Sequence, residues 1–250
     1  MNKLDPVLTI DSDNSDPSVI GEQYTVTWSS SPVDPDSPAV APNPPAPTGN
    51  VTVDDGTDFT TPVDIAVGGA ALTSTTGGVK TLTASYIGDS YYNPASATAT
   101  HTVNKGSVTI GVTPLTWTHG ATGLFTATVS RVPPTTGTPS GTVSFHIEDA
   151  GGITIANTGP HTLVAGVANS DPVTLTAGQS VVKVYVTYSG DARFNPASPT
   201  HTAVTVTPSG WAITGDTPDP SAVGQTITVT WEDPGTFPDD GQVTVSDGTD

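Results

Sequence analysis

Hydrophobic and polar residues alternate in short segments along the chain. In YTVTW, Tyr24, Val26 and Trp28 fall on one side of the pattern and the two threonines fall on the other. FTATV (125–129) and ITVTW (227–231) repeat this alternation, which is typical of a strand with one buried face. Threonine suits the outer face because its β-branched side chain favours strands and remains hydrated. We therefore expect an all-β protein with Trp28 and Trp231 in its core.

A longer segment occurs twice in the chain, each time directly after another stretch of alternating residues. YIGDSYYNPASAT (86–98) returns as YSGDARFNPASPT (188–200), 102 residues later. The stretches that lead into it place Tyr86 and Tyr188 at inward positions, so we expect both tyrosines in the core. A repeat of about 100 residues has the size of one β-sandwich.

The early part of the repeat also recurs. VIGEQYTVTW (19–28) returns as AVGQTITVTW (222–231), and GNVTVDDGTD (49–58) returns as GQVTVSDGTD (241–250). The repeats predict a first domain over 1–104, a second over 105–208, and the N-terminal part of a third over 209–250. Only about three residues separate consecutive domains, and linkers this short are expected to restrict the angle between them.

The third domain is expected to be incomplete, because 209–250 contains no counterpart of the YxGD segment. Half a sandwich leaves an apolar sheet face and strand edges in water. Two interpretations stay open. Either the chain is a piece of a longer array, or a neighbouring chain supplies the missing strands.

The combined motif resembles the bacterial Ig-like repeats of large surface and secreted proteins. It reads DPSVIGEQYTVTW, then GNVTVDDGTD, then TLTASYIGDSYYNPASAT in the first domain. The resemblance implies tandem immunoglobulin-like β-sandwiches that act as spacers, stalks or adhesive modules. It implies no shared catalytic residues.

The first domain departs from the motif in a proline-rich insert over 29–48. Seven prolines in this segment favour an extended polyproline II conformation. One interpretation is a surface loop between two strands. The other is a contact with a neighbouring domain or subunit.

Charge and composition exclude several classes of function. The net charge of −18 comes from 24 acidic and six basic residues, and the six are too scattered to bind a phosphate backbone. Nucleic-acid binding is therefore not expected. The chain has no cysteine, and no apolar run long enough for membrane insertion. It also lacks the short motifs of hydrolases, zinc proteases and phosphate-binding loops, so we do not expect an enzyme.

The Gly-Asp pairs of the YxGD segments are predicted to form structural turns. Gly88 and Gly190 permit a positive φ, and Asp89 and Asp191 can accept backbone N–H bonds across the turn. The prolines that follow each turn prevent further strand pairing; they are Pro94 and Pro196.

The segment DSDNSDPS suggests a calcium site. Asp11, Asp13 and Asp16 have nearly the spacing of an EF-hand loop, but the glycine and bidentate glutamate of that loop are missing. Calcium is the one cofactor that the sequence suggests. The alternative is that these aspartates are solubilising residues in turns. The five histidines, among them His101, are predicted to occupy surface positions.

These observations favour a structural segment of an extracellular or cell-surface protein, acting as a stalk, a spacer or a subunit of a fibre or filament. Its expected partners are neighbouring Ig-like domains and, through exposed edge strands, identical subunits. The alternative is an adhesion module that binds a glycan or a host-surface ligand through its end loops.

Overall fold

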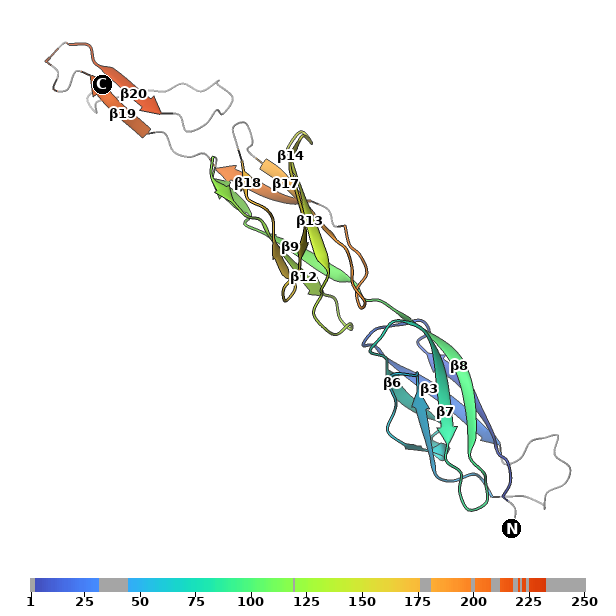
Figure 1. The fold of residues 1–250 in the computed structure, drawn as a ribbon. Coiled ribbons are helices and arrows are strands. Elements are labelled where there is room, and N and C mark those ends of the chain that lie inside the picture. Colours follow the sequence, from blue (N-terminus) through green and yellow to red (C-terminus); the bar gives the residue numbers. More distant parts are fainter. Residues whose placement is uncertain are drawn as a thin grey trace. The chain divides into compact units, whose positions relative to one another are not determined.

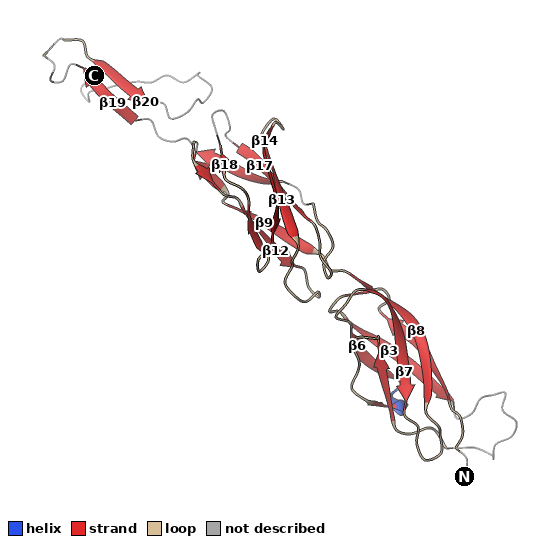
Figure 2. Cartoon of the chain, viewed as in Figure 1, coloured by secondary structure: helices blue, strands red, loops and turns tan. Residues whose placement is uncertain are grey.

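The computed structural model describes residues 3–31, 45–118, 120–175, 181–198, 201–207, 212–217, 220, 222–223 and 225–232. The chain forms two compact units. The first comprises 1–109, 130–139 and 190–195, and the second comprises 110–129, 140–189 and 196–250. Strands dominate both units (Figures 1 and 2), and the described part contains one helical turn, η1 (Ile65–Val67). No helix in that part has the length and apolar character needed to span a membrane.

The first unit contains a three-stranded and a five-stranded sheet. The three-stranded sheet has the order β1 (Val7–Asn14), β3 (Gln23–Ser31), β6 (Gly69–Thr73). The five-stranded sheet has the order β2 (Ser18–Val19), β8 (Ala95–Asn104), β7 (Gly78–Tyr86), β4 (Asn50–Asp54), β5 (Val63–Asp64). Neighbouring strands are antiparallel except for β2 and β8, which are parallel.

Inward side chains from both sheets of the first unit form one core. Val26 of β3 and Leu82 of β7 are fully buried, and Trp28 and Tyr86 are 4% and 2% exposed. The two large rings also satisfy their polar atoms. The Trp28 indole donates to the carbonyl of Ile65 at 3.1 Å, and the Tyr86 hydroxyl donates to the carbonyl of Thr48 at 2.7 Å. The predicted alternation therefore produces a closed sandwich.

The second unit has the same plan around its larger sheet. That sheet has the order β10 (Thr116–Thr118), β18 (Thr202–Thr207), β17 (Val181–Tyr188), β13 (Thr142–Asp149), β14 (Thr154–Thr162). It also has two smaller sheets. One has the order β15 (Val167–Asn169), β12 (Thr126–Arg131), β9 (Val108–Thr113), and the other pairs β11 (Thr122–Gly123) with β16 (Val173–Thr174). Again the first strand of the larger sheet is parallel to its neighbour, and Tyr188 is fully buried.

The prediction of an all-β protein built from tandem immunoglobulin-like β-sandwiches with short linkers is confirmed. β8 ends at Asn104 and β9 begins at Val108, which leaves three residues between them. β18 ends at Thr207, and the segments 130–139 and 190–195 group with the first unit.

Towards the C-terminus, β19 (Ala212–Thr217) and β20 (Thr228–Glu232) form an antiparallel pair. Trp231 lies in β20 opposite Ile213, but its side chain lies outside the described part of the structure. The predicted third domain is therefore described only for this pair of strands and a few adjoining residues. Residues 32–44 of the proline-rich insert also lie outside the described residues.

We predict that Leu82→Ala will destabilise the first unit by about 2–5 kcal/mol, because it leaves a cavity at a fully buried position. Val79→Ala is the matched control, since Val79 lies on the same strand and is 75% exposed. Urea unfolding measures both effects. Equal, small changes in the two variants would contradict the assignment of this face to the core.

Candidate metal centre

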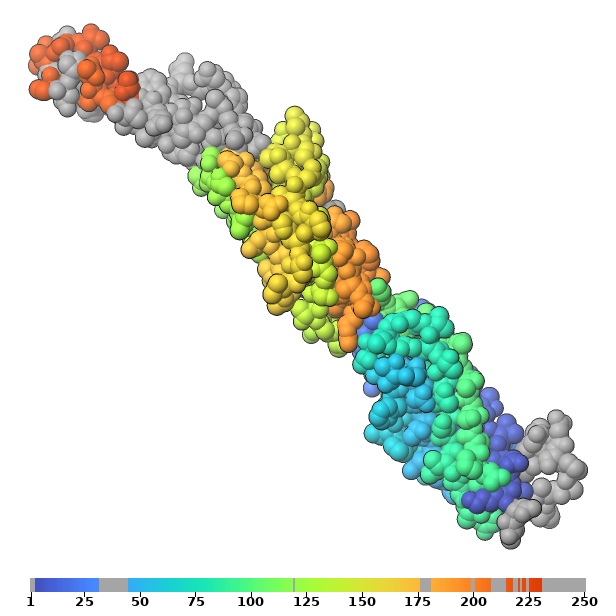
Figure 3. Space-filling model, in the orientation of Figure 1, coloured from blue at the N-terminus to red at the C-terminus, as the bar shows by residue number. Residues whose placement is uncertain are grey.

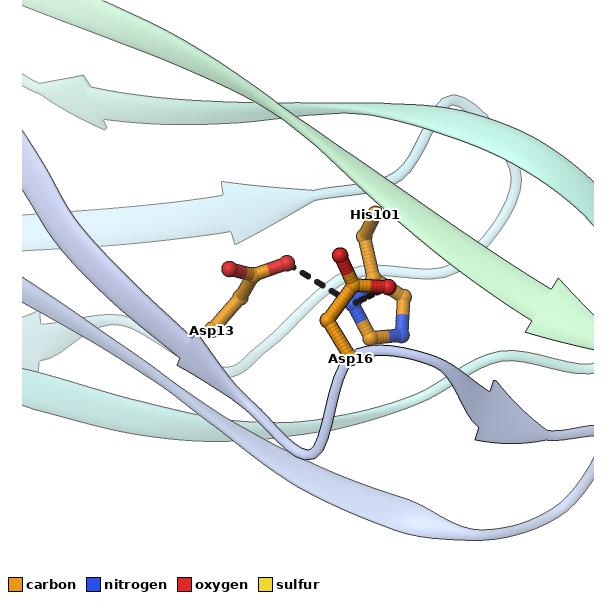
Figure 4. A group of neighbouring side chains, drawn as sticks. All are labelled: Asp13, Asp16 and His101. Carbon is orange, nitrogen blue, oxygen red and sulfur yellow. Dashed lines mark hydrogen bonds and ion pairs between the residues drawn. The ribbon is translucent and has the colours of Figure 1, made fainter.

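Three potential metal ligands meet at the edge of the first unit where β1 lies beside β8. Asp13 belongs to β1, Asp16 follows it in the next turn, and His101 belongs to β8 (Figure 4). The His101 Nδ1 atom lies 2.9 Å from Asp13 Oδ2 and 3.6 Å from Asp16 Oδ1. All three donor atoms lie within 4.8 Å of one another, and within the described residues no other group of this kind is found.

A β-bulge directs Asp13 towards this edge. Ile10 pairs with Trp28 and Ser12 pairs with Thr27, so Asp11 is an extra residue on β1. An extra residue reverses the side on which the following side chains emerge. Before the bulge the even-numbered residue Leu8 is buried, whereas after it Asp13 is the partly buried residue.

His101 is held rigidly inside the sandwich. Its ring is fully buried and stacks on Tyr24, with ring centroids 3.9 Å apart and planes 14° apart. The Nε2 atom lies 2.7 Å from Ser18 Oγ. A carboxylate can only accept, so Nδ1 donates its proton to Asp13, and Nε2 of the neutral ring accepts from Ser18. Both ring nitrogens therefore have partners, and the ring has one fixed orientation.

The two carboxylates remain accessible to solvent although the imidazole does not. The Asp13 side chain is 19% exposed and the Asp16 side chain is 39% exposed. Asp16 Oδ1 also accepts the backbone N–H of Thr102 at 2.8 Å, which fixes it to β8. An ion in solution can thus reach the carboxylates while the protein holds the ring in place.

The structure brings together only part of the set proposed from sequence. Asp13 and Asp16 converge, but Asp11 lies on the bulge and accepts a hydrogen bond from Ser29 Oγ at 2.9 Å. The interpretation of His101 as a surface residue was wrong, because its side chain is fully buried. The alternation of β8 contains the missed signal, since Ala97, Ala99, His101 and Val103 occupy the same face.

A line of buried polar groups continues inward from the cluster. The Tyr24 hydroxyl lies 3.0 Å from Ser74 Oγ, and Ser74 in turn donates to Asp55. The Lys80 ammonium lies 3.9 Å from the Asp55 carboxylate. Burial raises the pKa of Tyr24 to about 12, and the nearby carboxylates add to this effect. Tyr24 is therefore neutral at physiological pH and packs against His101 as an uncharged ring.

The carboxylate of Asp55 organises the turn that follows β4. Its Oδ1 atom accepts the backbone N–H groups of Thr57 and Asp58 at 2.9 and 2.7 Å. Burial raises the pKa of Asp55, but these hydrogen bonds, that from Ser74 and the charge of Lys80 lower the pKa more, so it lies below its ordinary value. Asp55 is thus an ionised structural residue.

The second unit fills the corresponding positions with apolar side chains. Val182 pairs with Val204 where Lys80 pairs with His101. Val204 lies two residues before Val206, and His101 lies two residues before Val103; both Val206 and Val103 belong to the parallel pairings. Trp117 lies opposite Val206 where Ser18 lies opposite Val103. The ring of Trp117 packs on Phe125, with centroids 4.6 Å apart. The same sheet arrangement therefore forms without the histidine cluster.

The Gly-Asp pairs lie in similar hydrogen-bonded turns. Asp89 Oδ1 accepts the N–H groups of Tyr91 and Tyr92 at 2.7 and 2.8 Å, and Asp89 Oδ2 accepts two hydrogen bonds from Thr48. Gly88 has a φ of +81°, and a Cβ there would lie 2.8 Å from the carbonyl oxygen of Tyr92. Glycine is therefore required at this position.

The second turn repeats this arrangement around Asp191. Its Oδ1 atom accepts the N–H groups of Arg193 and Phe194 at 2.7 and 2.8 Å, and Gly190 has a φ of +74°. In both turns the ring three residues after the aspartate is fully buried; these are Tyr92 and Phe194. Pro94 and Pro196 follow the turns and are exposed. The contacts of the two aspartates are those of a structural turn.

No protein-family model and no curated protein matches the chain. Among solved structures it is similar to the fibronectin(III)-like modules of Clostridium thermocellum CbhA, at 14% identity over 80% of this chain and 93% of that chain, with a TM-score of 0.28. It is also similar to the Escherichia coli adhesin FdeC, at 18% identity over 86% and 67% of the two chains, with a TM-score of 0.32. The Yersinia pseudotuberculosis adhesin InvE matches at 14% identity over 80% of this chain and 58% of its own, with a TM-score of 0.36. These values are low, so the fold is assigned from the sheets and cores described above.

We predict that Asp89→Ala will destabilise the first unit at pH 7 by about 1–3 kcal/mol, through loss of charge-assisted hydrogen bonds. Burial raises the pKa of Asp89, but the hydrogen bonds from Thr48, Tyr91 and Tyr92 lower it further, so the folded-state pKa lies below the unfolded one. The stabilisation is therefore present above about pH 4 and is lost as the pH falls towards the folded pKa.

Chemical denaturation at a series of pH values measures this difference. Ser90→Ala, an exposed change in the same turn, is the control and is expected to alter stability little at any pH. A constant difference between Asp89→Ala and the unmodified chain from pH 7 to pH 2 would contradict the role of the ionised carboxylate.

Proposed function

We propose that the chain is a structural segment of an extracellular or cell-surface protein, in which successive sandwiches act as a stalk or spacer. One observation carries this proposal. Each unit has its own core, and in each the first strand of the larger sheet pairs in parallel with the last strand of the repeat: β2 with β8, and β10 with β18.

Parallel pairing of an early and a late strand suits a segment that is under tension. In the first unit Ser18 lies opposite Val103 and Val19 lies opposite Asn104, and the N–H of Ile20 donates to the carbonyl of Asn104 at 3.0 Å. Pulling the chain ends apart draws the two parallel strands in opposite directions along their length. The hydrogen bonds between them are then loaded together rather than one after another, which raises the force needed to separate them.

The N-terminal segment adds a second connection of this kind. The N–H of Leu4 donates to the carbonyl of Tyr91 at 2.8 Å, and the N–H of Asn93 donates to the carbonyl of Leu4 at 2.8 Å. Gly106 makes the corresponding bonds at the start of the next repeat, at 2.9 Å to the carbonyl of Arg193 and 2.9 Å from the N–H of Asn195. The Gly-Asp turn of each repeat thus fastens the segment where that repeat begins.

The edge strands of the first unit favour a spacer over assembly through strand pairing. β2 and β5 are only two residues long, and β1 carries the bulge at Asp11. Short edges and bulges are features that discourage pairing with another chain. The high negative charge has the same effect, because identical acidic segments repel one another. A fibre or filament built through edge strands is therefore the less favoured form of the proposal, and adhesion through the end loops is the alternative function.

We predict that the chain, pulled through its two ends in a single-molecule force experiment, will unfold in two discrete events, one for each unit. Each event should release roughly 0.33–0.36 nm per unfolded residue. The chain contains no cysteine, so in a second experiment Lys3→Cys and Lys105→Cys together provide unique attachment points. They load β2 and β8 of the first unit in shear without loading the second unit, and should give a single event. Gradual extension without separate events would contradict the proposed mechanical role. Saturable binding of a glycan in solution would support the adhesion alternative instead.

A further inference from the structure

We propose that Asp13, Asp16 and His101 bind a divalent transition-metal ion of the zinc class. One imidazole nitrogen and two carboxylate oxygens already lie within 4.8 Å of one another. Two ligands of a tetrahedral ion, each about 2.0–2.2 Å from it, are roughly 3.3–3.6 Å apart. The distances from His101 Nδ1 to the carboxylates are 2.9 Å for Asp13, shorter than this range, and 3.6 Å for Asp16, at its upper end. Small rotations of the two aspartate side chains, both of which solvent can reach, would bring all three ligand atoms onto one ion.

The charge of the cluster favours a divalent cation. Two ionised carboxylates beside a neutral imidazole carry a charge of −2. Among the described residues, the ion pairs of Asp13 and Asp16 are with His101 alone, so neither carboxylate is paired with a lysine or an arginine. A divalent ion compensates both, and its ligands leave a coordination position that water can reach from the exposed side.

The donor set selects the class of metal. Calcium takes six to eight oxygen ligands, whereas zinc and its neighbours in the first transition row accept imidazole nitrogen together with carboxylate oxygen. Asp11 would have supplied a third carboxylate, but it lies on the bulge and bonds to Ser29. Because the imidazole of His101, and not a third carboxylate, completes the cluster, we expect an ion of the zinc class rather than calcium.

The surroundings of His101 allow Nδ1 to become a ligand. Binding requires an unprotonated Nδ1, so the neutral ring must take its other tautomer: Nδ1 releases its proton to solvent and Nε2 takes one up, which leaves the single ring proton on Nε2. Ser18 Oγ lies 2.7 Å from Nε2 and can accept that proton in a hydrogen bond. Outer partners of this kind orient metal-binding histidines. Stacking on Tyr24 fixes the plane of the ring, so Nδ1 points at the carboxylates.

Two observations outside the cluster support a specific role. The second unit builds the same parallel pairing with Val204 and Trp117 in place of His101 and Ser18, so the sandwich does not require these polar groups. The pair Asp13 and Asp16 recurs at 216 and 219, with the 203-residue offset that relates Trp28 to Trp231. The third repeat, which has Trp231 at the position of Trp28, therefore also has an aspartate at each of these two positions.

The test uses the full chain after removal of metals with a chelator. Co²⁺ is added and followed by visible absorption, and Zn²⁺ binding is measured by calorimetry. We expect one saturable site per chain, competition between Zn²⁺ and Co²⁺, and no competition from millimolar Ca²⁺. Asp13→Asn and Asp16→Asn should each weaken Zn²⁺ binding about tenfold or more.

These variants distinguish a role in binding metal from a purely structural role for each aspartate. An asparagine oxygen still accepts the N–H of Thr102 at position 16, or that of His101 at position 13, so the fold is retained while the charged ligand is lost. Asp11→Asn is the matched control and should bind Zn²⁺ as the unmodified chain does. His101→Val, which introduces the residue of the second unit, should abolish the site, with circular dichroism showing whether the strands are retained. Absence of saturable binding, or equal binding by the Asp13 and Asp16 variants and the unmodified chain, would overturn the proposal.

Discussion

Packing between the two inward sheet faces is the constraint on which the rest of the first unit depends. Without disulfides, the sandwich is held closed by apolar burial, to which the large buried rings of Trp28 and Tyr86 contribute. The hydrogen bonds of their polar atoms to Ile65 and Thr48 avoid the penalty of buried, unpaired donors. The turns, the parallel strand pair and the histidine cluster all depend on this closed core for their geometry.

Much of the architecture could be predicted from sequence because it is encoded locally. Alternation with period two identified the strands that contain Tyr24 and Tyr86, and the recurring Gly-Asp segment indicated where each repeat turns. These features depend on residues that are neighbours in the chain. A strand's exposed and buried faces are therefore readable without knowledge of its partners.

The candidate metal centre could be predicted only in part, for a physical reason. Asp13 and Asp16 are close in sequence and belong, with Asp11, to the calcium site predicted from the sequence, but His101 is 88 residues away from Asp13. Only the topology, which places β1 beside β8, brings them together. The displacement of Asp11 also depends on pairing, since a bulge is defined by the register between β1 and β3. The alternation of β8 by itself indicates that His101 faces inward.

The two units fill equivalent interior positions in two chemical ways. A buried network of histidine, tyrosine, serine, aspartate and lysine needs every partner in place, because an unsatisfied member is strongly destabilising. In the second unit, valine and phenylalanine side chains fill the space, and the one polar atom of Trp117 is satisfied by the carbonyl of Ala121 at 3.1 Å. Substitutions at single positions of the first network are therefore expected to be coupled, whereas those in the second unit depend mainly on volume.

The bulge at Asp11 decides which side chains of β1 face the interior. Before it the even-numbered residues point inward, and after it the odd-numbered residues do. Loss of Asp11 alone would leave Asp13 opposite Val26 and directed at the interior, because only the unpaired residue is removed. Loss of Asp11 together with Ser12 would place Asp13 directly after Ile10 and turn the carboxylate away from His101. The bulge thus lets this strand lose one residue without changing the side from which Asp13 emerges, a tolerance that no individual side chain reveals.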